Sequence, residues 1–209
     1  MEIEIKKCLP RNGAALGATL GAQHMENLYQ SIARRTLPVG ETVILNFKGI
    51  EQVNGSYIKA TALWFFLCGR MAVNPPSAMT PPRHFSDLRP YDLYIAVSNL
   101  SADVRTEFND FLQPRNIPML LAKRYSEKEI GEAVLLGHLD KTLQTTFETL
   151  IKHKAATAPF LHDLHPNENI TVTAWNNRLN DLHSLRLARR VRAGRSWEYQ
   201  PLTKKILWE

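Results

Sequence analysis

Residues 173–202 read TAWNNRLNDLHSLRLARRVRAGRSWEYQPL, and this stretch decides how the last third of the chain folds. Trp175, Leu179 and Leu182 are spaced at i, i+4 and i+7, which places their side chains on one face of a helix. We expect this helix to reach about Ser184. The basic segment that follows, interrupted by a glycine, predicts two short strands joined by a tight turn.

The outward face of this helix carries an unusual set of polar residues. Asparagine is a mediocre helix former, yet Asn176, Asn177 and Asn180 all point away from the apolar face. An asparagine side chain has both a donor and an acceptor, which suits base edges and phosphate oxygens in the major groove of DNA. With Thr173 and Arg178 they form the predicted DNA-reading surface. The stem of Arg178 could instead pack over the edge of the core.

Basic residues are concentrated after this helix. The chain has a net charge of +6, and residues 186–195 contain five arginines and no acidic residue. Such a local basic block is expected where a protein binds phosphate. A solvated basic face is the alternative. Four of these arginines are predicted to contact DNA, the last two beside Gly194 at the tip of the hairpin: Arg189, Arg190, Arg192 and Arg195.

Three helices and a hairpin are predicted within the C-terminal region. Helices are expected at about 140–154, at 156–164 and from Thr171 or Thr173 to Ser184, and the strands at 187–191 and 197–199. Helix, short helix, turn, helix and hairpin is the order of a winged helix-turn-helix. Winged helices bind DNA, and they also serve as protein-binding modules.

The motifs of this region resemble bacterial winged-helix regulators of the MarR and ArsR kind. The matching residues are Thr173, Trp175-Asn176-Asn177-Arg178-Leu179, Leu182, Leu185-Arg186-Leu187, Arg189-Arg190, Gly194-Arg195 and Tyr199-Gln200-Pro201-Leu202. The chain departs from the pattern at Trp175, where a small aliphatic residue is usual, and at Arg186, where glycine is usual. The resemblance implies binding to double-stranded DNA as a homodimer.

Alternating strands and helices predict an α/β domain in the N-terminal region. Strands are expected at residues 2–9, 42–47, 92–97 and 117–122, with helices at 23–35, 56–70 and from Ser101 to Pro114. This alternation is typical of a mainly parallel sheet. The predicted organisation is an α/β domain over 1–124 with a proline-rich loop at 71–90, a connecting helix at 125–139 and the winged helix at 140–209.

The N-terminal order resembles a STAS-like domain. The segment TVILNFKGIEQVNGSYIKATALWF, residues 42–65, contains a strand, a tight loop and a helix in the matching order. Anti-sigma-factor antagonists carry Asp-Ser-Ser-Gly in that loop, and a partner kinase phosphorylates the first serine. Here Asn54 replaces the aspartate, Gly55 stands at the first serine and Ser56 follows. We therefore expect Ser56 to cap the helix rather than to be a regulated site. The resemblance implies that this domain senses a protein partner or a ligand.

The sequence contains no recognisable catalytic motif. Gly13, Gly17 and Gly21 match neither a dinucleotide-binding motif nor a P-loop, so close helix packing is favoured over phosphate binding. His162 and His165 lie three apart without a metal-binding motif. We expect no catalytic site, no cofactor and no metal. With two cysteines, no signal-peptide core and no long apolar run, the chain is expected in the cytoplasm, away from membranes.

The sequence therefore favours a bacterial DNA-binding transcription regulator, in which a winged helix reads DNA and a STAS-like domain senses a partner or ligand. The alternative is an adaptor without enzyme activity, whose STAS-like and winged-helix domains both bind proteins.

Overall fold

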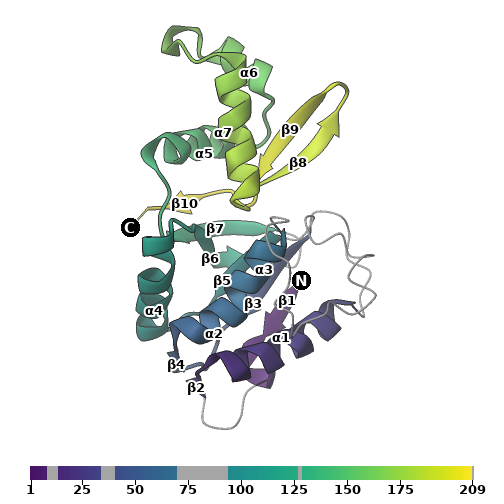
Figure 1. The fold of residues 1–209 in the computed structure, drawn as a ribbon. Coiled ribbons are helices and arrows are strands. Elements are labelled where there is room, and N and C mark those ends of the chain that lie inside the picture. The colour runs from purple at the N-terminus through teal and green to yellow at the C-terminus, as the bar shows by residue number, and fades with distance from the viewer. Residues whose placement is uncertain (9–13, 34–40, 70–93, 127–128, 209) are drawn as a thin grey trace.

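The computed structural model describes residues 1–8, 14–33, 41–69, 94–126 and 129–208 (Figure 1). The strands are β1 (Glu2–Glu4), β2 (Ala14–Ala15), β3 (Thr42–Asn46), β4 (Gln52–Val53), β5 (Tyr94–Ser98), β6 (Met119–Tyr125), β7 (Ile130–Leu136), β8 (Ala188–Ala193), β9 (Ser196–Pro201) and β10 (Ile206–Leu207). The α-helices are α1 (Ala18–Ala33), α2 (Gly55–Ala60), α3 (Ala62–Gly69), α4 (Ala102–Leu112), α5 (Lys141–His153), α6 (Ala158–Leu164) and α7 (Val172–Ser184). Short 3-10 helices are η1 (Ile5–Cys8), η4 (Gln113–Arg115) and η5 (Pro166–Glu168).

The largest sheet is six-stranded and mainly parallel. Its strand order is β1-β3-β5-β6-β7-β10, and every neighbouring pair is parallel except β6 and β7. Helices α5 to α7 and the antiparallel hairpin β8–β9 follow the sheet along the chain. The predicted fold class, a mainly parallel α/β domain followed by helices and a hairpin as in a winged helix-turn-helix, is confirmed.

Two hydrophobic cores lie on opposite faces of this sheet. Alternate residues of β3, such as Leu45 and Ile44, belong to different cores because side chains alternate across a strand. Leu45 packs in the core formed with α1 to α4. Ile44 packs in the core that contains Phe147 of α5 and Leu179 of α7. The C-terminal helices and the sheet therefore share a core.

The connecting helix predicted at residues 125–139 is wrong. This segment contains the end of β6 and the strand β7, which pairs antiparallel with β6. Ala133 is buried in one core and Val134 in the other, so β7 is covered on both faces and shows little alternation of apolar and polar residues. The C-terminal strand β10, which was not predicted, pairs with the outer edge of β7.

Several other elements differ from the predictions in their bounds. The strand predicted at residues 2–9 is short and runs into η1, and α1 begins at Ala18 rather than at residue 23. The helix predicted at 56–70 is two helices, because the backbone departs from helical geometry at Thr61 (φ −115°, ψ −90°). The predicted loop at residues 71–90 lies outside the described residues.

Close packing explains one of the spaced glycines. A Cβ atom at Gly21 of α1 would lie 2.7 Å from Cβ of Ala60, so only glycine lets α1 approach α2 this closely. This confirms the packing role favoured for Gly21, whereas Gly13 lies outside the described residues. Within the described parts of the chain, no helix has the length and apolar character needed to cross a membrane.

Candidate nucleic-acid interface

Helix α7 presents the polar face that the sequence predicts. Thr171 caps it, because its side-chain oxygen accepts a hydrogen bond from the backbone N–H of Ala174 at 3.2 Å. The apolar residues Trp175, Leu179 and Leu182 are at most 2% exposed. The predicted outward residues divide into the exposed Thr173, Asn176 and Asn177 and the half-buried Asn180 and Arg178.

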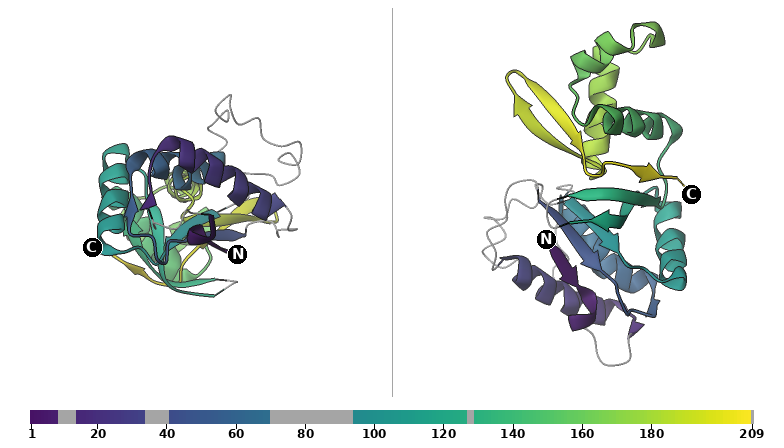
Figure 2. Two further views of the ribbon diagram at one scale, coloured as in Figure 1. Left: turned by 90° about the horizontal axis from the view of Figure 1, so that it is seen from below. Right: turned by 180° about the vertical axis from the view of Figure 1, so that it is seen from behind.

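The hairpin β8–β9 lies beside α7, and its tip points away from the sheet (Figures 1 and 2). Gly194 forms the turn at this tip with a φ of 60°, which favours glycine. Arg192 and Arg195 flank it and are exposed, as predicted. These two cations thus lie at the end of a projecting ribbon.

An arginine-tryptophan stack organises one face of the hairpin. The guanidinium carbon of Arg190 lies 4.6 Å from the ring centroid of Trp197, and that of Arg192 lies 5.0 Å from it. Arg190 also donates a hydrogen bond to the side-chain oxygen of Asn180 at 3.2 Å. Because a cation over an aromatic face is attracted to it, Trp197 holds both arginines, and Arg190 links the hairpin to α7. Sequence reasoning did not identify Trp197 as part of this surface.

The base of the hairpin is fixed to the segment between α5 and α6. The backbone N–H of Ala156 donates to the carbonyl of Tyr199 at 2.9 Å, and the N–H of Tyr199 donates to the carbonyl of Ala156 at 2.8 Å. Tyr199 is itself 1% exposed. This isolated antiparallel bridge attaches β9 to the segment before α6. The base of the hairpin is therefore fixed to the core, and this fixes the position of the tip.

Two predicted contact residues point elsewhere. The guanidinium of Arg178 lies 5.5 Å from the ring centroid of Trp175, which fits the packed stem considered for it. Arg189 faces the sheet, where it donates a hydrogen bond to Oγ1 of Thr42 at 2.9 Å and lies 5.9 Å from the ring centroid of Tyr94. Arg189 is therefore separate from the surface that Asn180, Arg190, Arg192 and Arg195 form.

The resembling regulators usually carry glycine where this chain has Arg186. The backbone there has a φ of 59°, in the left-handed region that favours glycine. The side chain is 3% exposed, and its guanidinium lies 5.3 Å from the ring centroid of Tyr94. The arginine thus joins the end of α7 to strand β5 of the sheet.

His183 lies at the same junction between α7 and the sheet. Its Nδ1 is 3.3 Å from the Tyr94 hydroxyl and 3.2 Å from the carbonyl oxygen of Ala188. Burial, together with the nearby charges of Arg190 and Arg186, lowers the pKa of His183 from 6.5 to about 4. The imidazole is therefore neutral in the folded protein at neutral pH.

This lowered pKa predicts a loss of stability in acid. Between pH 6.5 and about 4 the unfolded chain protonates at His183 while the folded chain does not, so the free energy of unfolding falls as the pH is lowered. Urea unfolding at pH 7 and pH 4.5 should show a larger loss for the wild type than for His183→Gln. An equal loss in both proteins would contradict the assignment.

The predicted regulatory loop forms a helix cap. Oδ1 of Asn54 accepts hydrogen bonds from the backbone N–H of Tyr57 at 3.0 Å and of Gly17 at 3.1 Å. Asn54 is therefore the N-cap of α2, and the prediction that Ser56 caps this helix is wrong. Ser56 is exposed in the first turn. Gly55 packs closely on α4, because a Cβ atom there would lie 2.8 Å from the ring of Phe111.

Replacement of the cap should destabilise the α/β domain. Asn54→Ala removes both hydrogen bonds, and we expect it to lower the free energy of unfolding by about 1–2 kcal/mol. Ser56→Ala is the matched control and should change it by less than about 0.5 kcal/mol. Urea unfolding of both variants measures the difference, and a larger effect from Ser56→Ala would reverse the assignment of the cap.

A polar network that sequence reasoning missed joins the ends of several sheet strands. The Tyr125 hydroxyl donates to Glu2 at 2.8 Å and lies 3.1 Å from Oγ of Ser98, while the Asn46 amide also donates to Glu2. Burial is the main cause that raises the pKa of Tyr125. Glu2 and Tyr125 are 123 residues apart, so no local pattern predicts their contact.

The two closely spaced histidines pair with neighbouring acids. Nδ1 of His162 lies 3.2 Å from Asp163, and Nδ1 of His165 lies 2.9 Å from Glu168. Among the residues that the structure describes, no three histidine, cysteine or acidic side chains are grouped so that they could hold a metal ion.

Comparison of the chain with known protein families, curated proteins and solved structures finds no match.

Proposed function

We propose that this chain is a bacterial transcription regulator that binds double-stranded DNA in the cytoplasm as a homodimer. In this proposal α7 enters the major groove, and the hairpin tip binds phosphates or the minor groove. The STAS-like α/β domain senses a protein partner or a small ligand. No catalysis, cofactor or metal is required.

The observation that carries the proposal is the joining of α7 and the hairpin into one polar, basic surface. Arg190 donates to Asn180 on α7 and stacks on Trp197 beside Arg192. Helix and hairpin therefore present their polar groups in a fixed relation. A groove-bound helix with flanking phosphate contacts needs this arrangement, because phosphate contacts fix the orientation in which side chains meet base edges.

The residues divide into two roles in this proposal. Exposed groups of α7 read base edges, since an asparagine amide can form two hydrogen bonds with adenine: Asn176 and Asn177, with Thr173 beside them. The hairpin cations bind phosphate: Arg190, Arg192 and Arg195. In a dimer, two such surfaces would meet half-sites about 34 Å apart, or a multiple of this distance.

Selection from a pool of random duplexes tests the proposal. The wild-type protein should enrich a short motif, repeated in inverted orientation if it is a dimer. Asn176→Ala/Asn177→Ala should lose this enrichment but keep salt-dependent binding to any duplex, because its hairpin arginines remain. Failure of the wild type to enrich any motif would count against base reading by α7.

An adaptor function is the second candidate, and exposed apolar residues near α6 favour it. Phe160 is 46% exposed, Leu164 is 45% exposed, and Val172 at the start of α7 is 38% exposed. Phe160 and Leu164 are four residues apart on α6 and so lie on one face of it, and exposed large apolar side chains that lie together are typical of protein-binding surfaces. Phe160→Ser/Leu164→Ser should abolish partner binding in an adaptor and leave DNA affinity unchanged in a regulator.

A further inference from the structure

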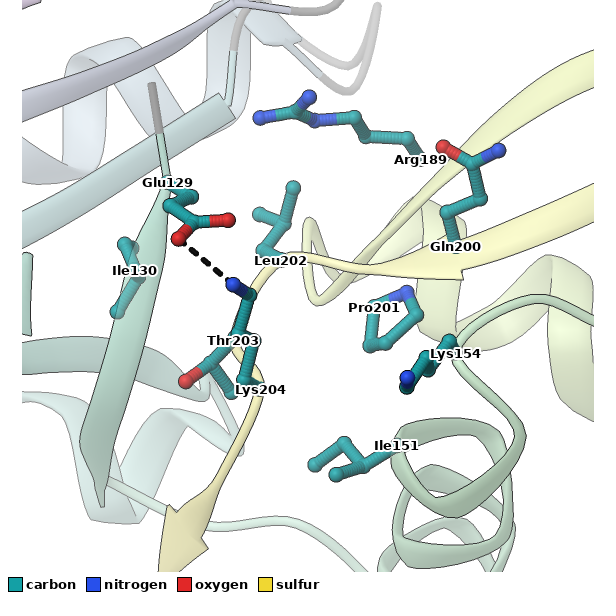
Figure 3. A pocket seen from close by; sticks show the side chains of 10 residues that line it. All are labelled: Glu129, Ile130, Ile151, Lys154, Arg189, Gln200, Pro201, Leu202, Thr203 and Lys204. Carbon is teal, nitrogen blue, oxygen red and sulfur yellow. Dashed lines mark hydrogen bonds and ion pairs between the residues drawn. The ribbon is translucent and has the colours of Figure 1, made fainter. Parts of the chain in front are cut away.

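A pocket of about 500 Å³ lies where the hairpin base and α5 meet the sheet (Figure 3). One wall comes from Glu129 and Ile130 at the start of β7. The opposite wall comes from Ile151 and Lys154 at the end of α5, and the segment between β9 and β10 also lines the space. The volume is within the range of small-molecule sites, about 300–1,000 Å³.

The charges around this pocket are not balanced. Nζ of Lys204 pairs with the Glu129 carboxylate at 2.7 Å, the ion pair drawn in Figure 3. The other two cations, Lys154 and Arg189, form no ion pair with any carboxylate in the described parts of the chain. The pocket wall therefore has an excess of positive charge.

Of these two cations, Arg189 is the one whose guanidinium is short of hydrogen-bond acceptors within the part of the chain that the structure describes. Its guanidinium donates to the neutral hydroxyl of Thr42, while its Nε is buried with no hydrogen-bond partner among the described residues. Burial lowers the pKa of Arg189, and the nearby acidic groups of Tyr94 and Glu41 only partly offset this effect. A partly buried cation with no carboxylate in direct contact is costly, and an anion placed beside it would relieve part of that cost.

The remaining walls are partly apolar, with Ile130, Ile151, Pro201 and Leu202 facing the space. We infer that this pocket binds a small organic anion, in which an apolar body contacts these side chains and a carboxylate or phosphate group is attracted by the positive charges of Lys154 and Arg189, which lie on different sides of the space (Figure 3). A neutral molecule of the same shape would lack the charge interactions. A cation would be repelled.

A ligand in this pocket would contact both parts of the molecule. Arg189 belongs to β8 of the hairpin and donates a hydrogen bond to Thr42 of the sheet. An anion that accepts a hydrogen bond from the same guanidinium would compete with Thr42. Lys154 ends α5, and Glu129 precedes β7. The role of this ligand as an effector of DNA binding rests on the proposed function, whereas binding itself does not.

Titrations followed by ¹⁵N–¹H NMR of the full chain test the inference without DNA. Benzoate and phenyl phosphate separate a carboxylate from a phosphate ligand, and benzamide is the neutral control. Lys154→Asn removes one cation and suits the backbone there, where φ is 65°, because asparagine tolerates positive φ. Lys152→Asn is the matched control, because Lys152 is exposed on α5 two residues before Lys154 and does not line the pocket.

We expect at least one of the two anions to shift the amide signals of Ile130 and Leu202 in a saturable way. Lys154→Asn should weaken this binding about fivefold or more, while Lys152→Asn should change it by less than about twofold. The inference fails if neither anion shifts these signals, if benzamide binds equally well, or if the two variants behave alike. Since no DNA is present, failure here leaves the proposed function standing, and failure to bind DNA leaves this pocket standing.

Discussion

Arg192→Ala/Arg195→Ala should weaken binding to the DNA upstream of the protein's own gene roughly 10-fold to 100-fold at low salt. Both side chains are exposed beside Gly194 at the hairpin tip. Each phosphate contact contributes about −0.9 to the slope of log K against log salt concentration. Loss of two contacts should therefore make this slope less negative by about 2. Fluorescence anisotropy at several salt concentrations measures both quantities.

A matched variant separates this effect from the loss of net charge. Lys48→Ala/Lys59→Ala also removes two positive charges, from exposed positions on the α/β domain. It should leave affinity and salt slope close to those of the wild type, because exposed charges far from the DNA are screened. Equal weakening by both double variants would show that the hairpin tip has no special role.

Gly137→Ala should destabilise the protein by about 3 kcal/mol or more, because a side chain there meets backbone. Gly137 joins β7 to the loop before α5 with a φ of 77°, and an added Cβ atom would lie 2.1 Å from the carbonyl oxygen of Ile117. Its N–H also donates to the side chain of Asn109 at 2.9 Å. The backbone at Gly137 and the segment before β6 that contains Ile117 would have to separate.

Gly194→Ala is the control for this prediction, since it has a positive φ of 60° but open space around it. It should cost only the strain of the left-handed backbone, about 1–2 kcal/mol. Urea unfolding compares the two variants. If Gly137→Ala is no more destabilising than Gly194→Ala, the close contact with Ile117 is not part of the folded structure.

Local pattern was sufficient for the surface of α7. The spacing of Trp175, Leu179 and Leu182 fixes the buried face, and all three side chains are buried as predicted. Helix periodicity then determines which asparagines face outward. The caps at Thr171, Ser101 and Asp140 also follow from local chemistry, because a short polar side chain before a helix can accept from its free N–H groups.

Strand β7 shows where local pattern fails. Its residues IGEAVLL contain good helix formers, and burial on both faces removes the alternation of apolar and polar residues that identifies a strand with one solvated face. Pairing with β6 and β10 decides its structure, and those partners are tertiary contacts. Tertiary packing therefore overrides the helix propensity of this segment.

The contacts of the arginines could not be predicted from the basic block alone. Arg189 and Arg190 are neighbours in a strand, so their side chains point to opposite faces. One face meets Tyr94 and Thr42 of the sheet, and the other meets Trp197 and the outward face of α7. Which arginine takes which role depends on how the hairpin packs, and the sequence around it contains no signal for that.

The central claim is that α7 and the hairpin read DNA, and a binding titration tests it most directly. Wild-type protein would be titrated by fluorescence anisotropy into its own upstream DNA and into a scrambled duplex, at about 50 mM and 200 mM salt. The account predicts binding to the upstream DNA roughly tenfold tighter or more, and weaker binding to both duplexes at higher salt. Equal and negligible binding to both duplexes would contradict the claim and favour the protein-binding adaptor.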